Sequence, residues 1–411
     1  MAASELGSTT DRMRVDEYDR ALDDFDITHP LWSKDFHGLQ DHIRAKCPVL
    51  HSEAQGGYYV LTKHADIVTV LRDHETYSSA GGVFLTPLPG NQQLIPTDAD
   101  PPIQREYRRL IDGYLSAARV APLEPQIRQT ANDLVDAFVD RGHCELYHEF
   151  ATPLPGQVFM HLIIDVHGED EEEANRRVES AMSSETLEEV EAGFNGLKQW
   201  CSDLIRRREQ GEPRDDLIGG LIRGRVFDRA MSHDEQVSAL MSITIGGLET
   251  ASSVIGYGVV LLIENPAVLQ QIRKDPALLP VAVEEIIRLA SPTALMRTVT
   301  KDAELSGQKL VSGDRVLIVF PAANRDPLAF SEPNKFSLDR PNAKQAVSFG
   351  MGMHRCLGSN LARMTLRTAF GTLLDRLEDI RLTEPVSFTA TQIRSPRAVN
   401  IAFRRCEDGG T

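Results

Sequence analysis

The sequence predicts a mainly α-helical fold with small β-sheets. Most of the 411 residues lie in stretches whose apolar residues recur at three- and four-residue spacing, which is typical of helices with one buried face. Strand patterns around turn residues occur in two short regions, 49–62 and 308–320. The apolar content of 41% is enough to bury a large core.

The predicted elements follow from these patterns in chain order. Residues 49–62, VLHSEAQGGYYVLT, contain two strand segments around a Gly-Gly turn, and residues 308–320, QKLVSGDRVLIVF, contain two more around Ser-Gly-Asp. Helical spacing extends through residues 65–74, 127–141, 194–211, 276–290 and 360–377.

The most apolar predicted helix covers residues 238–263 and is long enough to cross a membrane. Glu249 argues against a span, since a carboxylate near the bilayer centre costs about 2.5–3.5 kcal/mol. We therefore expect a long helix through a globular core. Gly246 and Gly247 each cost this helix about 1 kcal/mol relative to Ala, so they either leave room for a ligand or admit a closely packed helix.

Composition limits the classes of partner and compartment. The net charge of −16 makes nucleic acid an unfavourable partner. No linker or repeat divides the chain, so we expect one domain over residues 26–405, with a polar, flexible segment at 1–25 and a polar tail at 406–411. Without a secretory signal pattern, the expected compartment is the cytoplasm. Five scattered cysteines without CxxC argue against a disulfide framework, a zinc site and an iron–sulfur cluster.

One cysteine lies in an unusual setting, the stretch SFGMGMHRCLGSNLAR at residues 348–363. Its glycines allow a tight loop whose N–H groups point at the sulfur of Cys356, and the following helix adds its positive end, so both effects favour a thiolate. A thiolate is either a nucleophile or a metal ligand. His354 is a candidate base for hydrolase or transferase chemistry, but no third orienting group is evident. A lone thiolate also fits haem iron, whose other ligands come from a macrocycle.

This stretch resembles the FGxGxHxCxG ligand loop of the cytochrome P450 family, matching it at six positions: Phe349, Gly350, Gly352, His354, Cys356 and Gly358. A chance match in a chain of this length is on the order of 10⁻⁵. The resemblance implies the P450 fold, with haem b between the long central helix and the helix that follows the loop. It also implies that Cys356 is the iron ligand, and that Phe349, Gly350, His354 and Gly358 bind the cofactor.

Further segments match the family in the expected order. GGLET resembles the oxygen-activating stretch of the central helix, which implies that Glu249 and Thr250 organise protons for bound oxygen. EIIR resembles the family's ExxR pair, Glu285 and Arg288, which the family buries with an arginine matched here by Arg340. Without the resemblance, an i, i+3 pair of this kind is most simply a surface ion pair. We interpret these three residues as a structural network.

Family positions also supply donors for the two haem propionates. They are Gln104, Arg108, Arg297 and His354. Many relatives have His where this chain has Gln104, and both this departure and the two glycines of GGLET resemble the camphor-hydroxylase branch of soluble, ferredoxin-dependent bacterial enzymes.

The implied function is that of a haem-thiolate monooxygenase. The chain contains no GxGxxG and no flavin domain, so we expect electrons to come from a separate ferredoxin and its reductase. A local basic excess within residues 341–376 could steer an acidic ferredoxin; it comprises Lys344, Arg355, Arg363, Arg367 and Arg376. A peroxide-driven haem enzyme and a non-catalytic haem sensor remain alternatives. The Glu249–Thr250 pair argues against the first, and a sensor would more naturally carry a partner or DNA-binding domain, of which the sequence shows no sign.

The substrate is expected to be a small or medium hydrophobic molecule, such as a terpenoid or an aromatic compound. Candidate pocket residues come from the family's variable regions: Gln92, Ile245, Gly246, Leu295 and Ile393. Gln92 is available to hydrogen-bond a carbonyl or hydroxyl group. Whether Arg394 faces the pocket, where it would bind a carboxylate, is left open by the sequence.

Overall fold

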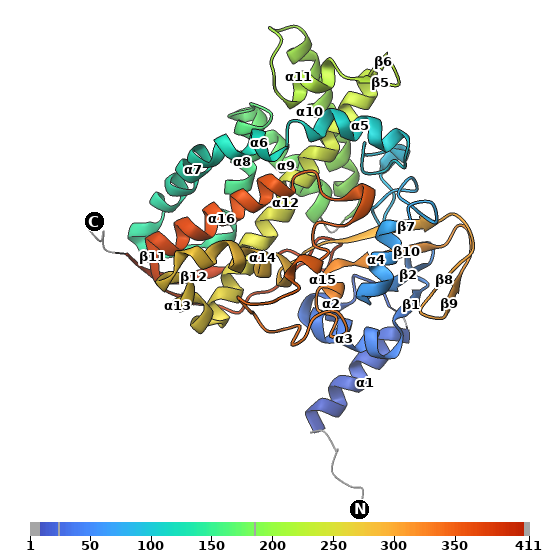
Figure 1. Cartoon of the computed structure of the whole chain (residues 1–411), viewed down its shortest axis with the longest axis vertical. Helices are drawn as coiled ribbons and strands as arrows, with labels where there is room; N and C mark the ends of the chain where they lie inside the picture. The colour runs from blue at the N-terminus through green and yellow to red at the C-terminus, as the bar shows by residue number, and fades with distance from the viewer. Residues whose placement is uncertain (1–8, 24, 185, 407–411) are drawn as a thin grey trace, which may run out of the picture.

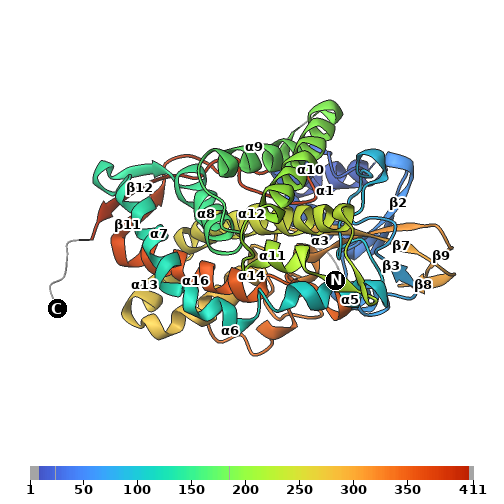
Figure 2. The same ribbon diagram turned by 90° about the horizontal axis from the view of Figure 1, so that it is seen from above.

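A computed structural model describes residues 9–23, 25–184 and 186–406. The chain is mainly helical, and its two larger sheets lie at opposite ends of the molecule (Figures 1 and 2). This architecture confirms the predicted fold class.

The α-helices lie at α1 (Thr9–Asp23), α2 (Pro30–Lys34), α3 (Phe36–Lys46), α4 (His64–Arg72), α5 (Ile103–Asp112), α6 (Ala117–Val120), α7 (Glu124–Asp136), α8 (Pro153–Leu162), α9 (Glu169–Ser183), α10 (Leu187–Glu209), α11 (Leu217–Ile222), α12 (His233–Glu264), α13 (Pro266–Lys274), α14 (Leu279–Leu289), α15 (Phe320–Ala323) and α16 (Ser359–Arg376). The strands are β1 (Val49–Ser52), β2 (Tyr58–Leu61), β3 (Tyr77–Ser78), β4 (His143–Glu145), β5 (Arg225–Val226), β6 (Arg229–Ala230), β7 (Ala294–Val299), β8 (Ala303–Leu305), β9 (Gln308–Leu310), β10 (Arg315–Val319), β11 (Leu377–Leu382) and β12 (Asn400–Arg405).

Helix α12 runs through the middle of the molecule, as Figure 2 shows. It starts with a capping box, in which the Ser232 side chain accepts from the Glu235 N–H and the Glu235 side chain accepts from the Ser232 N–H. By length and hydropathy α12 would pass for a membrane span, but 67% of its most apolar window is buried inside the protein. The helix is therefore packed as the core helix that the sequence predicted.

The side chains of α12 belong to two apolar clusters. Ile255 and Val259 pack with α7, α14 and α16, whereas Leu240 and Ile243 pack with α8, α9 and α10. The turn that contains Gly246 and Thr250 lies between these two groups along the helix. Tertiary packing thus holds both ends of α12 and leaves its middle for the site.

The larger sheet has the strand order β1-β2-β10-β7-β3. Strands β1 and β2 pair antiparallel across the predicted Gly-Gly turn, with Leu50 opposite Val60. The predicted strands at 308–320 both form, but they do not pair with each other. Strand β9 pairs with β8, while β10 lies parallel to β2 and antiparallel to β7, with Leu317 opposite Met296. The sheet thereby connects the N-terminal region to the segment that carries Arg297.

Part of the N-terminal segment is helical. Residues 9–23, which the sequence led us to expect as flexible, form α1, whose Tyr18 and Ala21 are buried against α2 and α3. Arg14 pairs with Asp35 across this contact. Residues 1–8, Asp24 and residues 407–411 of the expected N-terminal segment and C-terminal tail lie outside the described residues.

Candidate active site

The loop before α16 is shaped by two glycines. Gly350 and Gly352 both have a φ of +65°, a conformation that side chains disfavour. A Cβ on Gly352 would also lie 2.7 Å from the carbonyl oxygen of Leu71. The loop is closed by the N–H of Cys356, which donates to the carbonyl of Phe349 at 2.8 Å. The predicted tight backbone around the cysteine is therefore present.

The thiol of Cys356 is accessible to solvent, although many protein atoms lie around its loop. These surroundings raise its pKa, and the N–H of Gly358 and the charges of Arg108 and Arg363 only partly oppose that effect. The loop N–H lowers the pKa as the sequence argument expected, but that argument left out the desolvation by surrounding protein atoms, which is the larger effect. A metal cation bound to the sulfur would supply the missing stabilisation of a thiolate.

Gly358 and Phe349 have roles in the loop that differ from the simplest interpretation of the sequence. Gly358 has a φ of −80°, which any residue can adopt, so its role is to donate its N–H to the sulfur and to leave open space, since a Cβ there would meet no atom within 4 Å. The ring of Phe349 lies under the guanidinium of Arg363, 4.4 Å from its centroid. Phe349 thereby fixes the loop to α16.

Gln104 and Arg108 approach the loop from α5. Both donate to the carbonyl oxygen of Met353, at 2.7 Å from Gln104 Nε2 and 3.1 Å from Arg108 Nη1. Gln104 is fully buried, and its Oε1 has no hydrogen-bond partner among the described residues. The helix spacing i, i+4 that linked them in the sequence thus brings both side chains to one loop carbonyl.

Arg297 and His354 meet beside Asp100. The side chain of Arg297 is almost completely buried, and burial lowers its pKa to about 10. Burial and the charge of Arg297 lower the pKa of His354 to about 4, so its imidazole is neutral at pH 7. The Nε2 of His354 is buried without a hydrogen-bond partner among the described residues, and it lies 3.8 Å from an oxygen of Asp100.

These residues fit a haem group by their chemistry. The accessible Cys356 sulfur provides an axial ligand, and Arg297 and Arg108 provide positive charge for propionates. The buried Nε2 of His354 offers one further polar atom that lacks a partner. Nearby carboxylates stabilise the buried guanidinium of Arg297, but they form no direct ion pair with it. This guanidinium therefore also favours the binding of an anionic ligand group.

The two glycines of α12 have different neighbours. A Cβ on Gly247 would lie 2.9 Å from the ring of Phe159 in α8, whereas a Cβ on Gly246 would meet no atom within 4 Å. Both explanations left open by the sequence therefore apply, one to each glycine. Gly247 admits a closely packed helix, and Gly246 borders open space. The Thr250 hydroxyl donates to the Gly246 carbonyl at 3.2 Å, beside Glu249.

The Glu285, Arg288 and Arg340 side chains form a buried network. Arg288 contacts Glu285 through two hydrogen bonds of 2.8 and 2.7 Å, and Arg340 Nε donates to the same carboxylate at 2.8 Å. Burial would raise the pKa of Glu285, but the two arginines together lower it. Arg288 also donates to the carbonyl of Asn324.

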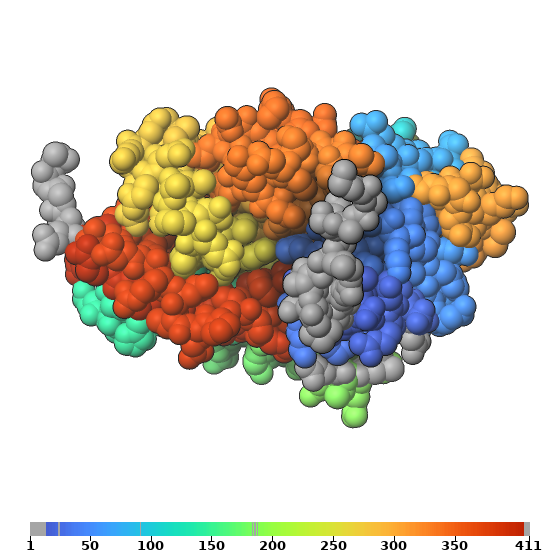
Figure 3. All heavy atoms as spheres, turned by 90° about the horizontal axis from the view of Figure 1, so that it is seen from below, coloured from blue at the N-terminus to red at the C-terminus, as the bar shows by residue number. Residues whose placement is uncertain are grey.

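Asn324 connects this network to the cysteine loop through hydrogen bonds. Its side chain accepts from the Val347 N–H at 2.8 Å and donates to Ser348 Oγ at 2.7 Å. On the face shown in Figure 3, the segment around residues 324–340, drawn in orange, lies between α13 in yellow and the N-terminal elements in blue. Its hydrogen bonds connect α14 to the loop.

The predicted substrate residues lie on several elements. Ile245 is buried in the apolar cluster of α8 to α12, and Ile393 forms a bridge with Thr293 before β7. Leu295 is two residues from Arg297 in β7, so both side chains lie on one face of the strand. Ile245, Leu295 and Ile393 line neither of the two cavities described below.

Gln92 lines a cavity of about 150 Å³ with residues 80–84, Pro87, Leu88 and Gln93. Its Nε2 donates to Asn195 of α10 at 3.2 Å, and its buried Oε1 has no partner among the described residues. The amide thus ties the segment before α5 to α10. Because the Nε2 of Gln92 already donates to Asn195, only its Oε1 acceptor is available for a contact with substrate.

Arg394 is surrounded by aromatic rings. Its guanidinium lies 3.5 Å from the ring centroid of Phe388, and the rings of Phe36 and Tyr257 are also within 5.5 Å. Burial lowers its pKa to about 10. Its guanidinium is thus held by cation–π contacts.

The basic stretch at 341–376 is partly neutralised. Arg363 forms two hydrogen bonds with Glu284 at 2.6 and 3.1 Å, and Arg376 pairs with Asp136. Lys344, Arg355 and Arg367 are exposed. The surface charge is therefore smaller than the sequence count indicated, because two partners come from distant helices.

Sequence reasoning missed Asp100 and a group of hydroxyls behind α12. Asp100 accepts from Ser79 N–H at 3.1 Å and faces Arg297 and His354. Its position next to the Pro-Pro pair before α5 was visible, but nothing in the sequence placed it beside β7.

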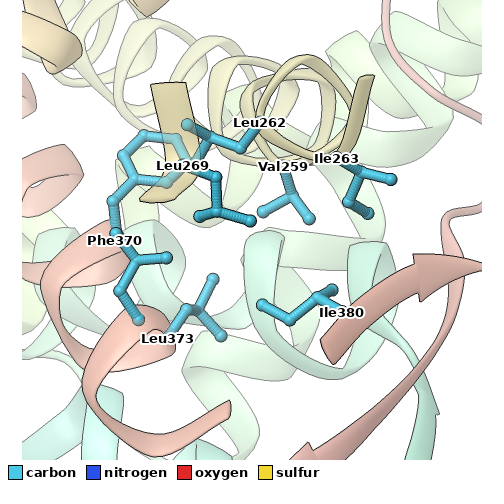
Figure 4. Close-up of a pocket in the computed structure, with 8 residues that line it drawn as sticks. Val259, Leu262, Ile263, Leu269, Phe370, Leu373 and Ile380 are labelled. Atoms are coloured by element: carbon cyan, nitrogen blue, oxygen red, sulfur yellow. The ribbon is translucent and has the colours of Figure 1, made fainter. Parts of the chain in front are cut away.

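A gap of about 10 Å³ in the apolar core between α12, α16 and β11, lined by side chains such as Val259 and Phe370, is too small for a substrate (Figure 4).

Known proteins share this fold and sequence pattern. The family model described as Cytochrome P450 matches residues 180–391. The chain is 31% identical to the steroid C26-monooxygenase of Mycobacterium tuberculosis over 83% of this chain and 91% of that protein. It is 33% identical to the pentalenic acid synthase of Streptomyces avermitilis, over 70% of this chain and 71% of that one.

Solved structures agree with the sequence comparison. The structure of cytochrome P450 CYP109Q5 from Chondromyces apiculatus superposes with a TM-score of 0.84 at 28% identity, over 94% of this chain and 99% of that chain. Both kinds of similarity extend over most of the chain, and the residues that the family model matches include α12 and the cysteine loop. The protein belongs to the cytochrome P450 family and is a haem b-dependent monooxygenase.

Proposed function

We propose that this P450 hydroxylates a small or medium hydrophobic molecule, with electrons from a separate ferredoxin and its reductase. The observation that carries the proposal is the accessible thiol of Cys356 before α16 together with the open Gly246 turn of α12, a helix that packs against α16. Relatives named for a steroid and for pentalenic acid support a mainly hydrocarbon substrate, within the class of terpenoids and aromatic compounds.

In this proposal, Cys356 is the protein ligand to the haem iron. Bound haem supplies the centre at which dioxygen is reduced, and the thiolate favours cleavage of the O–O bond. Arg108, Arg297 and the neutral imidazole of His354 bind the propionates, while Gln104 holds the Met353 carbonyl in place. Phe349 and Gly350 shape the loop, and the Gly358 N–H supports the sulfur.

Glu249 and Thr250 deliver the protons that the reaction consumes. One C–H bond and one dioxygen molecule, with two electrons and two protons, give one C–OH group and one water. Thr250 lies at the open turn and holds its hydroxyl on the Gly246 carbonyl, where it can orient a proton donor without admitting bulk water. Glu249, one residue earlier, passes protons to it.

The substrate pocket follows from the same geometry. Ile245, Leu295 and Ile393 would supply apolar walls, and Gly246 leaves open space beside α12 that a substrate could occupy. The buried Oε1 of Gln92 is an acceptor, so we propose that it selects a substrate with a hydroxyl or another donor at the end remote from the oxidised carbon.

Electrons would enter from the surface near the cysteine loop. The exposed Arg355 and Arg367 attract an acidic ferredoxin there, and the short distance along the loop from Arg355 to Cys356 favours transfer at this face. We also propose that residues 26–405 act as one domain, and that the protein works in the cytoplasm.

Oxygen labelling tests the proposed function. Compounds are first screened for a change in haem spin state, and the best binder is then turned over with a ferredoxin and its reductase under ¹⁸O₂. We expect one labelled oxygen atom in the product and oxygen consumption that the substrate stimulates. Turnover with peroxide but with no ferredoxin would instead identify the peroxide-driven haem enzyme. Haem that binds carbon monoxide or dioxygen without any product or substrate-stimulated oxygen consumption would identify the non-catalytic sensor.

A further inference from the structure

Residues 83–97 belong to the connection between β3 and α5, and the start of this segment is attached to β7. The Val83 carbonyl accepts from the Met296 N–H of β7 at 2.9 Å. Both residues are buried, and Met296 lies between Leu295 and Arg297 in the strand. The start of the segment is therefore held beside the strand that carries two residues of the proposed substrate and haem sites.

The end of the same segment is attached to helix α12. The Ile95 N–H donates to Ser238 Oγ at 3.0 Å, and Thr97 Oγ1 lies 2.8 Å from Ser242 Oγ. Ser238 and Ser242 are four residues apart, so they share one face of the helix, and the next position on that face is Gly246. The end of the segment therefore lies about one helical turn before the open space beside Gly246.

A single buried carboxylate joins the two ends of the segment. Asp98 Oδ1 accepts from the Val83 N–H at 3.1 Å, and Asp98 Oδ2 accepts from the Leu94 N–H at 2.8 Å. The Asp98 N–H also donates to the Leu94 carbonyl at 2.7 Å. The chain between these two attachments contains Gln92, which lines the cavity of about 150 Å³ together with Val83. Asp98 thus connects two parts of the cavity wall.

One wall of this cavity is fixed by close packing. A Cβ on Gly81 would overlap the hydroxyl of Thr298 in β7, so the wall formed by residues 80–82 lies directly against the strand. The other wall belongs to residues 87–93, and its attachments to the protein include Asp98 and the hydroxyls of α12. The width of the cavity therefore depends on these attachments.

Asp98 occupies its position at an electrostatic cost. The residue is only 3% exposed, and burial raises its pKa to about 6. The N–H groups of Leu94 and Val83 and the charge of Arg297 only partly oppose this effect. A carboxylate that is retained beside a cavity despite such a cost is typical of a functional site.

We propose that Asp98 is a positioning residue that fixes the pocket wall carrying Gln92 against the substrate. Asp98 is not among the residues that line the cavity, so it acts through those that are. Its two oxygens hold the Leu94 end of the wall at a set distance from the Val83 end, and Ser238 holds the same end from α12. The inference rests on the proposed substrate pocket and names a residue that sets its dimensions.

Two iron-binding probes of different size test this role in the haem-loaded protein. Imidazole binds the iron and needs little space, whereas 4-phenylimidazole also needs the walls of the pocket. Spectral titration gives the Kd of each probe for wild type, Asp98→Asn and Ser238→Ala. Asp326→Asn is the matched control. Asp326 is also buried and accepts two backbone N–H groups, from His64 at 2.8 Å and Leu328 at 2.9 Å, but it joins α4 to the segment after α15.

We expect Asp98→Asn to raise the Kd of 4-phenylimidazole by about tenfold, which is the effect of one lost hydrogen bond to a charged group. The amide keeps one acceptor oxygen, but its NH₂ faces the second backbone N–H. The Kd of imidazole should change by less than about twofold, because that probe does not reach the wall. Ser238→Ala should shift the ratio of the two Kd values in the same direction by about threefold. Asp326→Asn should lower the denaturation midpoint and leave the ratio unchanged.

An unchanged ratio in both Asp98→Asn and Ser238→Ala would show that these contacts serve stability only and would overturn the inference. If Asp98→Asn yields no haem-loaded protein, the ratio in Ser238→Ala decides. Neither titration involves dioxygen or a ferredoxin. A shifted ratio without labelled product would therefore support the role of Asp98 and refute the hydroxylation, whereas labelled product with an unchanged ratio would refute only the present inference.

Discussion

The loop that carries Cys356 and the turn of α12 that carries Thr250 have opposite designs. The loop is closed by its own backbone, with glycines at positive φ and the Cys356 N–H bonded to the Phe349 carbonyl. The α12 turn is regular helix, and its important feature is the open space beside Gly246. A metal ligand must be held at one point, whereas an oxygen and substrate site needs volume. The predictions below ask how far this contrast extends.

The largest effect is expected at the ligand itself. Replacing Cys356 with His removes the thiolate, so the absorption band typical of the thiolate-bound ferrous carbonyl haem should be lost completely. The measurement is the difference spectrum of the reduced, carbon monoxide-bound protein. If the thiolate-type spectrum survived the substitution, a residue other than Cys356 would have to bind the iron, although no other cysteine lies in a loop of this shape.

The second prediction concerns the support of the loop. Glu285→Gln leaves Arg288 and Arg340 buried without their carboxylate, and breaking a buried pair in this way costs about 3–5 kcal/mol. We expect a lower denaturation midpoint and faster haem loss, because the Asn324 contacts to the loop depend on Arg288. Glu284→Gln, one residue earlier at the surface, is the control and should cost less than about 1 kcal/mol.

On the α12 side, Thr250→Ala should leave folding, haem content and substrate binding nearly unchanged. Product formed per oxygen consumed should fall by about tenfold or more, since the positioned hydroxyl no longer directs the second proton. The missing flux should appear as hydrogen peroxide, so product, peroxide and oxygen are measured together. Full coupling in this variant would remove Thr250 from the proton path.

The adjacent glycines give a smaller effect of opposite sign. Gly247→Ala forces a Cβ to within 2.9 Å of the Phe159 ring and should destabilise the protein by about 1–3 kcal/mol. Gly246→Ala meets no atom and should stabilise the helix by up to about 1 kcal/mol, while it weakens substrate binding by filling the open space. Denaturation and spin-state titration measure the two effects. Equal losses of stability would show that both glycines only serve packing.

The smallest expected effect is at the surface. Arg355→Glu should slow reduction by the ferredoxin several-fold and weaken its dependence on salt, because an exposed charge steers association. Arg363→Glu should act partly through folding, since Arg363 already pairs with Glu284 and covers Phe349. Stopped-flow reduction at two salt concentrations distinguishes the variants. Identical reduction rates in wild type and Arg355→Glu would argue against docking at this face.

Much of the site could be read from the chain because its signals are local. The strands around the Gly-Gly turn, the capped central helix and the glycine-flanked cysteine each lie within a few residues of the groups that form them. The roles within these signals were less accessible. The pKa of Cys356, the different neighbours of Gly246 and Gly247, and the pairing of Arg363 depend on atoms from distant elements.

By itself, the sequence determined the helical class and the glycine-flanked cysteine loop, because backbone conformation and hydrophobic periodicity are properties of short segments. The residues proposed to hold haem came from the resemblance of these segments to the cytochrome P450 family. Only the tertiary structure decided that β9 and β10 pair with different strands, that Arg394 lies among aromatic rings, and that Ser253 of α12 contacts Ser395. These arrangements join residues far apart along the chain. Their free energy comes from burial and hydrogen bonds that exist only once the segments are packed together.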